Sequence, residues 1–99
     1  MTNPPYADQG RRLRLLRQVE GFRTASAFAA RAGWPDSGLS QFETGLRRVP
    51  RDKLLQLRQI IPGFHPYWLW DGDTRLLSDD LRVRIEAEEG RRSGERRPV

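Results

Sequence analysis

The fold is decided by residues 24–50, which read TASAFAARAGWPDSGLSQFETGLRRVP. The stretch opens with an alanine-rich run, and alanine has the highest helix propensity of the common residues. Gly33 closes that run, because glycine readily adopts the left-handed conformation in which many helices end. A second helical run follows Trp34 and stops at Gly45, just before a pair of arginines. The pattern predicts two short helices joined by a tight turn, with a basic loop behind the second helix.

This layout is typical of a helix-turn-helix, in which the second helix lies in the major groove of DNA. We expect Thr24 to cap the first helix and residues 35–44 to form the second. Leu39 and Phe42, three residues apart, should anchor the second helix from behind. Its outer side, which includes Gln41, is then free to enter a groove.

Helical patterns also lie on both sides of this unit. Leu13 and Leu16 share one face of a predicted helix over residues 9–20, which Gly21 ends. Further helices are predicted over residues 51–61, 66–70 and 79–88. No stretch of useful length alternates as a strand does. The sequence therefore predicts an all-α fold of five helices with an extra C-terminal helix.

The chain divides into four parts by composition and pattern. We expect a flexible N-terminal arm (1–8), a helix-turn-helix domain (9–73), a C-terminal helix (74–89) and a disordered tail (90–99). The arm holds two adjacent prolines and little that can pack. The tail is charged and contains glycine and proline, a composition typical of disorder.

Composition excludes several classes of site. There is no cysteine, which excludes disulfides, thiolate metal ligands and a cysteine nucleophile. The single histidine cannot form a metal site alone, and nothing pairs it with a nucleophile, so we expect no metal, no cofactor and no enzyme activity. No apolar run approaches the roughly 18 residues of a membrane span. The N-terminus lacks the features of a signal peptide, so a cytoplasmic protein is expected.

The charge is positive and unevenly placed. The net charge is +5, and residues 1–50 carry eight arginines against four acidic residues, which accounts for +4 of it. This excess favours a polyanionic partner. Arginine supplies 17 of the 18 basic residues, so codon bias in a GC-rich genome explains the composition equally well.

The residues resemble a known family. The motif positions are Phe28-Ala29, Gly33, Leu39-Ser40, Phe42-Glu43, Gly45, Arg47-Arg48 and Pro50. They are similar to the Cro/lambda-repressor type of helix-turn-helix, the XRE family, and the segments LLQLRQII and YWLW extend the resemblance over about residues 11–72. The resemblance implies a five-helix lambda-repressor-like domain that binds double-stranded DNA sequence-specifically. It also implies a small transcriptional regulator, a repressor acting as a dimer.

The resemblance further places the residues that would read bases. They are Asp36, Ser37, Ser40 and Gln41. Gln41 is the best candidate, because its amide both donates and accepts and so matches adenine N6 and N7. Asp36 either accepts from cytosine N4 or only stabilises the helix N-terminus. Gly38 either permits close approach to DNA or marks an irregular first turn.

A second set is expected on the phosphates, which position the protein without reading sequence. These residues are Arg12, Arg23, Thr24, Arg47 and Arg48. The alternative for Arg47 and Arg48 is an ordinary solvated basic face. Arg14 and Arg17 are expected on the helix surface, and Glu43 is expected to pair with an arginine. Arg47→Ala should weaken binding to all DNA, whereas Gln41→Ala should relax the preference at one base position.

A dimer is expected because one recognition helix reads only a few base pairs. Apolar residues beyond the usual core of the family suggest its surface: Trp70, Leu76, Leu77, Leu81 and Ile85. Among the aromatic residues, Tyr67 and Trp70 are the candidates to face a partner.

Two alternatives remain open from the sequence. The first is an antitoxin-type or adaptor protein whose repressor-like fold mainly binds a protein partner, with residues 74–99 folding on that partner. The second is a non-specific binder of nucleic acid or acidic surfaces that depends only on the arginine excess.

Overall fold

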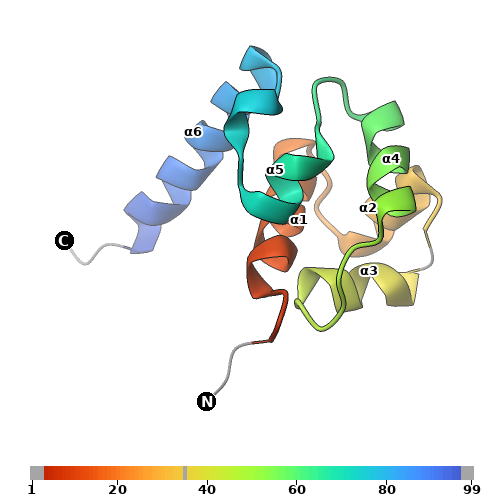
Figure 1. The fold of residues 1–99 in the computed structure, drawn as a ribbon. Helices are drawn as coiled ribbons and strands as arrows, with labels where there is room; N and C mark the ends of the chain where they lie inside the picture. The colour runs from red at the N-terminus through yellow and green to blue at the C-terminus, as the bar shows by residue number, and fades with distance from the viewer. Residues whose placement is uncertain (1–3, 35, 97–99) are drawn as a thin grey trace.

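A computed structural model describes residues 4–34 and 36–96, with the side chains of residues 36, 37 and 92–96 outside that description. This part of the chain folds entirely into helices and connections (Figure 1). The elements are α1 (Ala7–Val19), α2 (Ala25–Ala32), α3 (Asp36–Glu43), α4 (Arg51–Ile60), α5 (Pro66–Asp71), the 3-10 turn η1 (Thr74–Leu76) and α6 (Asp79–Arg96). The predicted all-α class with an extra C-terminal helix is confirmed.

Local signals set the ends of the helices. The Thr24 hydroxyl accepts from the Ala27 N–H at 3.1 Å and caps α2, as predicted. Gly33 ends that helix in the left-handed conformation, with φ of 77°. At the start of α6, the Ser78 hydroxyl accepts from the Leu81 N–H at 3.2 Å. Each cap satisfies a backbone N–H that the helix itself leaves without a partner.

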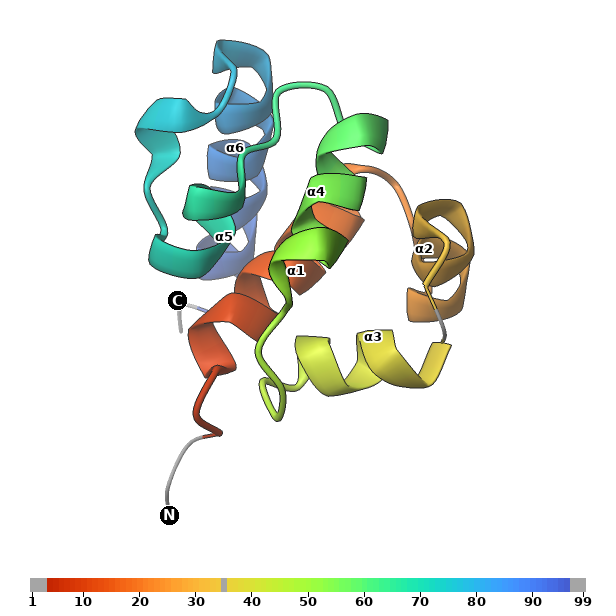
Figure 2. The ribbon, with the colours of Figure 1, turned by 45° about the vertical axis from the view of Figure 1, so that its right-hand side comes forward.

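Helix α1 lies at the centre, against α3, α5 and α6, and α2 packs on α3 and α4 (Figures 1 and 2). The core contains fully buried leucines of α1, α3 and α4 around Phe28. Trp34 sits between the rings of Phe28 and Phe42, with centroids 6.3 and 5.8 Å away and both contacts edge-on. Gly10 lets α1 approach α3 closely, because a Cβ there would meet the backbone carbonyls of Phe42 and Glu43.

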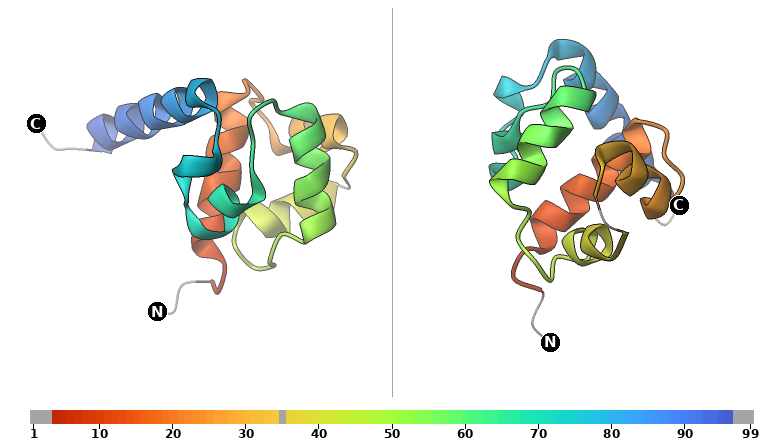
Figure 3. Two further views of the ribbon diagram at one scale, coloured as in Figure 1. Left: turned by 45° about the horizontal axis from the view of Figure 1, so that its top comes forward. Right: turned by 90° about the vertical axis from the view of Figure 1, so that its right-hand side faces the viewer.

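The C-terminal part differs from the expectation in two ways. Leu77, Leu81 and Ile85, predicted to face a second copy, are at most 6% exposed and close the core of this chain, because α6 packs on α1. Helix α6 also continues to Arg96, so the disordered tail predicted from residue 90 is wrong for the described residues up to 96. The glycine at position 90 disfavours a helix by only about 1 kcal/mol, and the Glu88–Arg91 pair at 2.6 Å supports the turn around it. Beyond its packed first turns, α6 extends away from the body (Figure 3).

The flexible N-terminal arm predicted over residues 1–8 is wrong for residues 4–8, and residues 1–3 lie outside the described part of the chain. Helix α1 begins at Ala7, and the Tyr6 N–H donates to the Gly45 carbonyl at 3.0 Å, so residues 4–8 join the domain. Within residues 4–34 and 36–96, none of the helices combines the length and apolar character needed to cross a membrane. The same residues bring together no group of three metal-ligating side chains.

Candidate nucleic-acid interface

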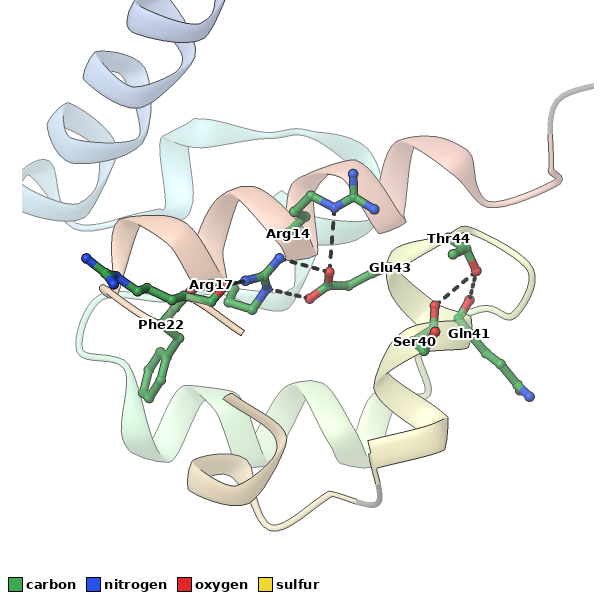
Figure 4. A network of polar contacts seen from close by, with 8 residues as sticks. Arg14, Arg17, Phe22, Ser40, Gln41, Glu43 and Thr44 are labelled. Carbon is green, nitrogen blue, oxygen red and sulfur yellow. Dashed lines mark hydrogen bonds and ion pairs between the residues drawn. The ribbon is translucent and has the colours of Figure 1, made fainter. Parts of the chain in front are cut away.

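Helix α3 has a buried side and an exposed side, and lies at the edge of the molecule (Figure 2). Leu39 is fully buried and Phe42 is 4% exposed, which confirms both as anchors. Ser40 and Gln41 are exposed on the other side. The Gln41 side chain points away from the helix bundle, and the Thr44 hydroxyl beside it donates to the carbonyls of Ser40 and Gln41 at 3.0 and 3.2 Å (Figure 4). At Ser40 and Gln41, the outer side of α3 is therefore open to solvent.

The basic loop turns back beside this exposed side. Gly45 ends α3 with φ of 81°, a conformation that favours glycine. The backbone N–H groups of Leu46 and Arg47 then donate to the Gln41 carbonyl at 3.1 and 3.3 Å. Arg47 and Arg48 are exposed, and the Arg48 guanidinium lies 5.4 Å from the centre of the Trp70 ring. The Arg47 guanidinium thus stands beside the exposed side of α3, whereas that of Arg48 faces α5.

Leu46 belongs to the same surface, although the sequence pattern did not predict it as a site residue. Its side chain is 62% exposed between Gly45 and the two arginines. Single exposed apolar residues are common on protein surfaces, so the exposure of Leu46 alone assigns it no role. The only signal in the sequence was its place next to the arginine pair, which says nothing about exposure.

A further cation stands at the start of α2. Arg23 and Thr24 are both exposed there. The Thr24 hydroxyl is occupied as the helix cap, and the carbonyl of Arg23 accepts from the Arg17 guanidinium at 2.9 Å. The backbone at Arg23 is therefore anchored to α1 through Arg17, next to the capped start of α2.

A buried ion pair connects these parts (Figure 4). Arg17 donates to both carboxylate oxygens of Glu43, at 2.8 and 3.3 Å, and to the carbonyls of Phe22 and Arg23 at 3.1 and 2.9 Å. Arg17 and Glu43 are each 8% exposed, and Arg14 adds a looser contact to Glu43 at 3.6 Å. The predicted pairing of Glu43 is confirmed.

The expectation that Arg17 lies on the surface is wrong. Its position is four residues after Leu13, on the same side of α1 as the apolar residues, so the helical period placed it toward the core. Arg17 joins α1, the segment before α2 and the end of α3. The pair therefore fixes α3 relative to the start of α2.

Residues 9–60 match a family model described as a helix-turn-helix domain. The chain belongs to this helix-turn-helix family. The match covers α1 to α4, the elements that carry the surface just described, and agrees with the resemblance to the XRE type. No curated protein and no solved structure matches the chain. Domains of this class bind DNA, with the second helix of the motif as the recognition helix.

The other residues predicted to bind DNA or a second copy of this helix-turn-helix protein do not form part of the surface around α3 in the described structure. Arg12 does not join the basic loop, because its guanidinium donates to the carbonyls of Leu69 and Trp70 at the end of α5, at 2.9 and 3.3 Å. Burial lowers the pKa of Arg12, and the neighbouring Arg11 lowers it further. Among the predicted dimer residues Leu76 is 46% exposed, whereas Trp70 is half-buried. The side chains of Asp36 and Ser37 lie outside the described part of the structure.

Proposed function

We propose that this protein binds double-stranded DNA sequence-specifically through α3 and acts as a small transcriptional repressor. One observation carries the proposal. The side of α3 that bears Ser40 and Gln41 is exposed, while Leu39 and Phe42 hold the helix rigidly from behind. A helix of this shape fits the major groove, where base edges present distinct patterns of donors and acceptors. A recognition helix buried in the monomer would have excluded this role.

The exposed side chains divide into two groups by chemistry. Ser40 and Gln41 carry short or amide hydrogen-bonding groups suited to base edges, and the first turn of α3 adds Asp36 and Ser37 to the proposed set. A second group serves the phosphates: Arg23, Arg47 and Arg48 supply cations, and Thr24 stands beside Arg23 at the start of α2, whose dipole favours an anion there. The first group would specify the sequence and the second would position the protein on the duplex.

Repression and dimerisation are part of the same proposal. One α3 contacts only a few base pairs, so a single domain binds weakly, whereas two copies on a twofold site combine their affinities. Leu77, Leu81 and Ile85 are not available for that contact. Sedimentation of the protein with and without its DNA site should show two copies per site. One copy at tens of micromolar on bound DNA would remove the dimer from the proposal.

The central experiment selects bound sequences from random duplex DNA. We expect enrichment of a short site, and binding that weakens as salt increases. Arg48→Ala should lower affinity for every sequence and make the salt slope shallower by about 0.9, because one phosphate contact is lost. Arg58→Ala is the matched control, since Arg58 is exposed in the last turn of α4, at the end away from α3 (Figure 2).

The outcomes separate the proposal from its main competitor. A selected site, with Arg48→Ala weakened and Arg58→Ala unchanged, supports sequence-specific binding through the α3 face. Steep salt dependence without any enrichment would contradict it and favour non-specific binding. Equal losses for both arginine variants would show that charge alone, and not the α3 face, binds the DNA.

A further inference from the structure

We infer that Arg47 is a positioning residue for base recognition, which orients the Gln41 amide in addition to contacting phosphate. The inference rests on the proposed function and concerns its specificity. It changes the simple division of roles, in which Arg47 serves only phosphate and Gln41 only a base. The two side chains form one reading unit instead.

The geometry joins these residues twice. The Arg47 side chain donates from Nη1 to Gln41 Oε1 at 3.2 Å. Its backbone N–H donates to the Gln41 carbonyl at 3.3 Å, so the loop is also tied to the recognition helix through the main chain. The guanidinium carbon lies 5.9 Å from the centre of the Phe42 ring, which is buried and gives the arginine a fixed surface to rest on.

The chemistry of arginine determines which way the amide faces. A guanidinium has only donors, so the Gln41 atom that faces Arg47 must be the oxygen. The amide nitrogen is then the group turned away from the loop. An exposed glutamine without this contact can turn its amide over, which exchanges donor and acceptor. Arg47 therefore selects one of two hydrogen-bonding patterns before DNA arrives.

The selected pattern still suits adenine. The Gln41 oxygen has a second lone pair, which can accept from adenine N6 while the amide nitrogen donates to adenine N7. An amide that is free to turn over presents either pattern of donor and acceptor, so it would select adenine over the other bases less strongly. We therefore expect a strong preference for an A·T pair opposite Gln41, and we expect this preference to depend on Arg47.

Arg48 provides the matched control. It lies in the same loop, carries the same charge and is also exposed. Its guanidinium faces the Trp70 ring at 5.4 Å, whereas that of Arg47 faces Gln41. Arg47→Ala and Arg48→Ala thus remove one cation each from neighbouring positions, and the first also removes the contact to Gln41. Both residues are exposed, so both variants should fold, which a thermal melt checks.

The test applies the random-duplex selection to the wild type and to Arg47→Ala, Arg48→Ala, Gln41→Ala and the Arg47→Ala/Gln41→Ala double variant. Both arginine variants should lose affinity and show a salt slope shallower by about 0.9. The base pair opposite Gln41 is the position at which Gln41→Ala loses its preference. There the wild type should prefer one base over the others by about tenfold or more. Arg47→Ala should reduce that preference at least threefold, Arg48→Ala should leave it unchanged, and the double variant should be no less selective than Gln41→Ala.

The result that overturns the inference is specific. If Arg47→Ala keeps the wild-type preference at every position and differs only in affinity, Arg47 is a phosphate contact alone. The proposed function would survive that outcome. Failure of the wild type to enrich any sequence would instead overturn the proposed function, and the inference with it.

Discussion

Removing the Arg17 side chain should destabilise the protein by about 3–5 kcal/mol, the cost of leaving a buried charge without its partner. In Arg17→Met the Glu43 carboxylate, 8% exposed, loses two hydrogen bonds, at 2.8 and 3.3 Å. The carbonyls of Phe22 and Arg23 lose their donor as well. Arg14 compensates little, because its contact to Glu43 is 3.6 Å long and its side chain is 47% exposed.

The loss is large for a domain of this size. Small domains have roughly 5–15 kcal/mol of stability, and each kcal/mol corresponds to about 4–8 °C in melting temperature. Equilibrium unfolding in urea, followed by circular dichroism, measures the free energy directly. Arg14→Ala is the control and should change it by less than about 1 kcal/mol.

A double-mutant cycle tests the reasoning further. Glu43→Leu alone leaves the Arg17 cation without a carboxylate, and Arg17→Met with Glu43→Leu leaves neither charge in the core. The double variant should recover much of the loss of Arg17→Met, since an apolar pair in place of a buried ion pair is often neutral. If Arg17→Met costs no more than Arg14→Ala, the pair does not hold α1 and α3 together and the argument from burial fails.

Three other predictions concern glycines within helices and the contact between Asp73 and Arg75. Gly10→Ala should lower the free energy of unfolding in urea by about 1–3 kcal/mol, because the added methyl would lie 2.7 Å from a carbonyl oxygen of α3. Gly90→Ala is the control. Its methyl would have no neighbour within 4 Å, so it should stabilise α6 by up to about 1 kcal/mol. Equal effects of the two would contradict the close approach of α1 and α3. Gly38→Ala should raise the melting temperature, since the nearest neighbouring atom is 3.9 Å from the added methyl and alanine favours the helix. The same substitution should weaken DNA binding if DNA approaches α3 closely at this position. Unchanged affinity for DNA would rule out the close approach. Hydrogen bonds from the Arg75 side chain and then its backbone lower the pKa of Asp73 from 3.8 to about 2, so the carboxylate contributes stability above pH 3.8 that is lost as the pH falls toward 2. Arg75→Ala should raise the pKa of Asp73 in an NMR titration, and an unchanged pKa would show that the side-chain hydrogen bond is not its cause.

Much of the helix-turn-helix could be predicted because its signals are local. The cap at Thr24 and the left-handed turn at Gly33 depend on residues within one helical turn. The spacing of Leu39 and Phe42 determines which side of α3 is buried once any core is present. The exposed side of the recognition helix follows from the same spacing, so the exposure of Gln41 could be predicted from the apolar pattern alone.

The basic residues were predicted less well, because a charge pattern does not say which partner a side chain meets. Arg12, Arg17 and Arg47 all read as exposed cations of the first half of the chain. In the structure Arg12 donates to carbonyls at the end of α5. Arg17 donates to the Glu43 carboxylate, and Arg47 donates to the Gln41 amide oxygen. The first two partners are 57 and 26 residues away, so only the folded chain brings them together, whereas Gln41 is six residues from Arg47 and is reached through the local turn at the end of α3.

The sequence by itself determined the two helices of the helix-turn-helix, the turn between them and the exposed side of α3 at Gln41, since propensity, capping and apolar period act within a few residues. Tertiary structure alone decided what covers each apolar face and where each arginine goes. Leu81 and Ile85 show the difference: their spacing requires that something cover them, and only the packing of α6 on α1 shows that the chain covers them itself. The physical reason is that the hydrophobic effect is non-directional, so an apolar face can be covered by any apolar surface. Which surface covers it depends on the path of the whole chain.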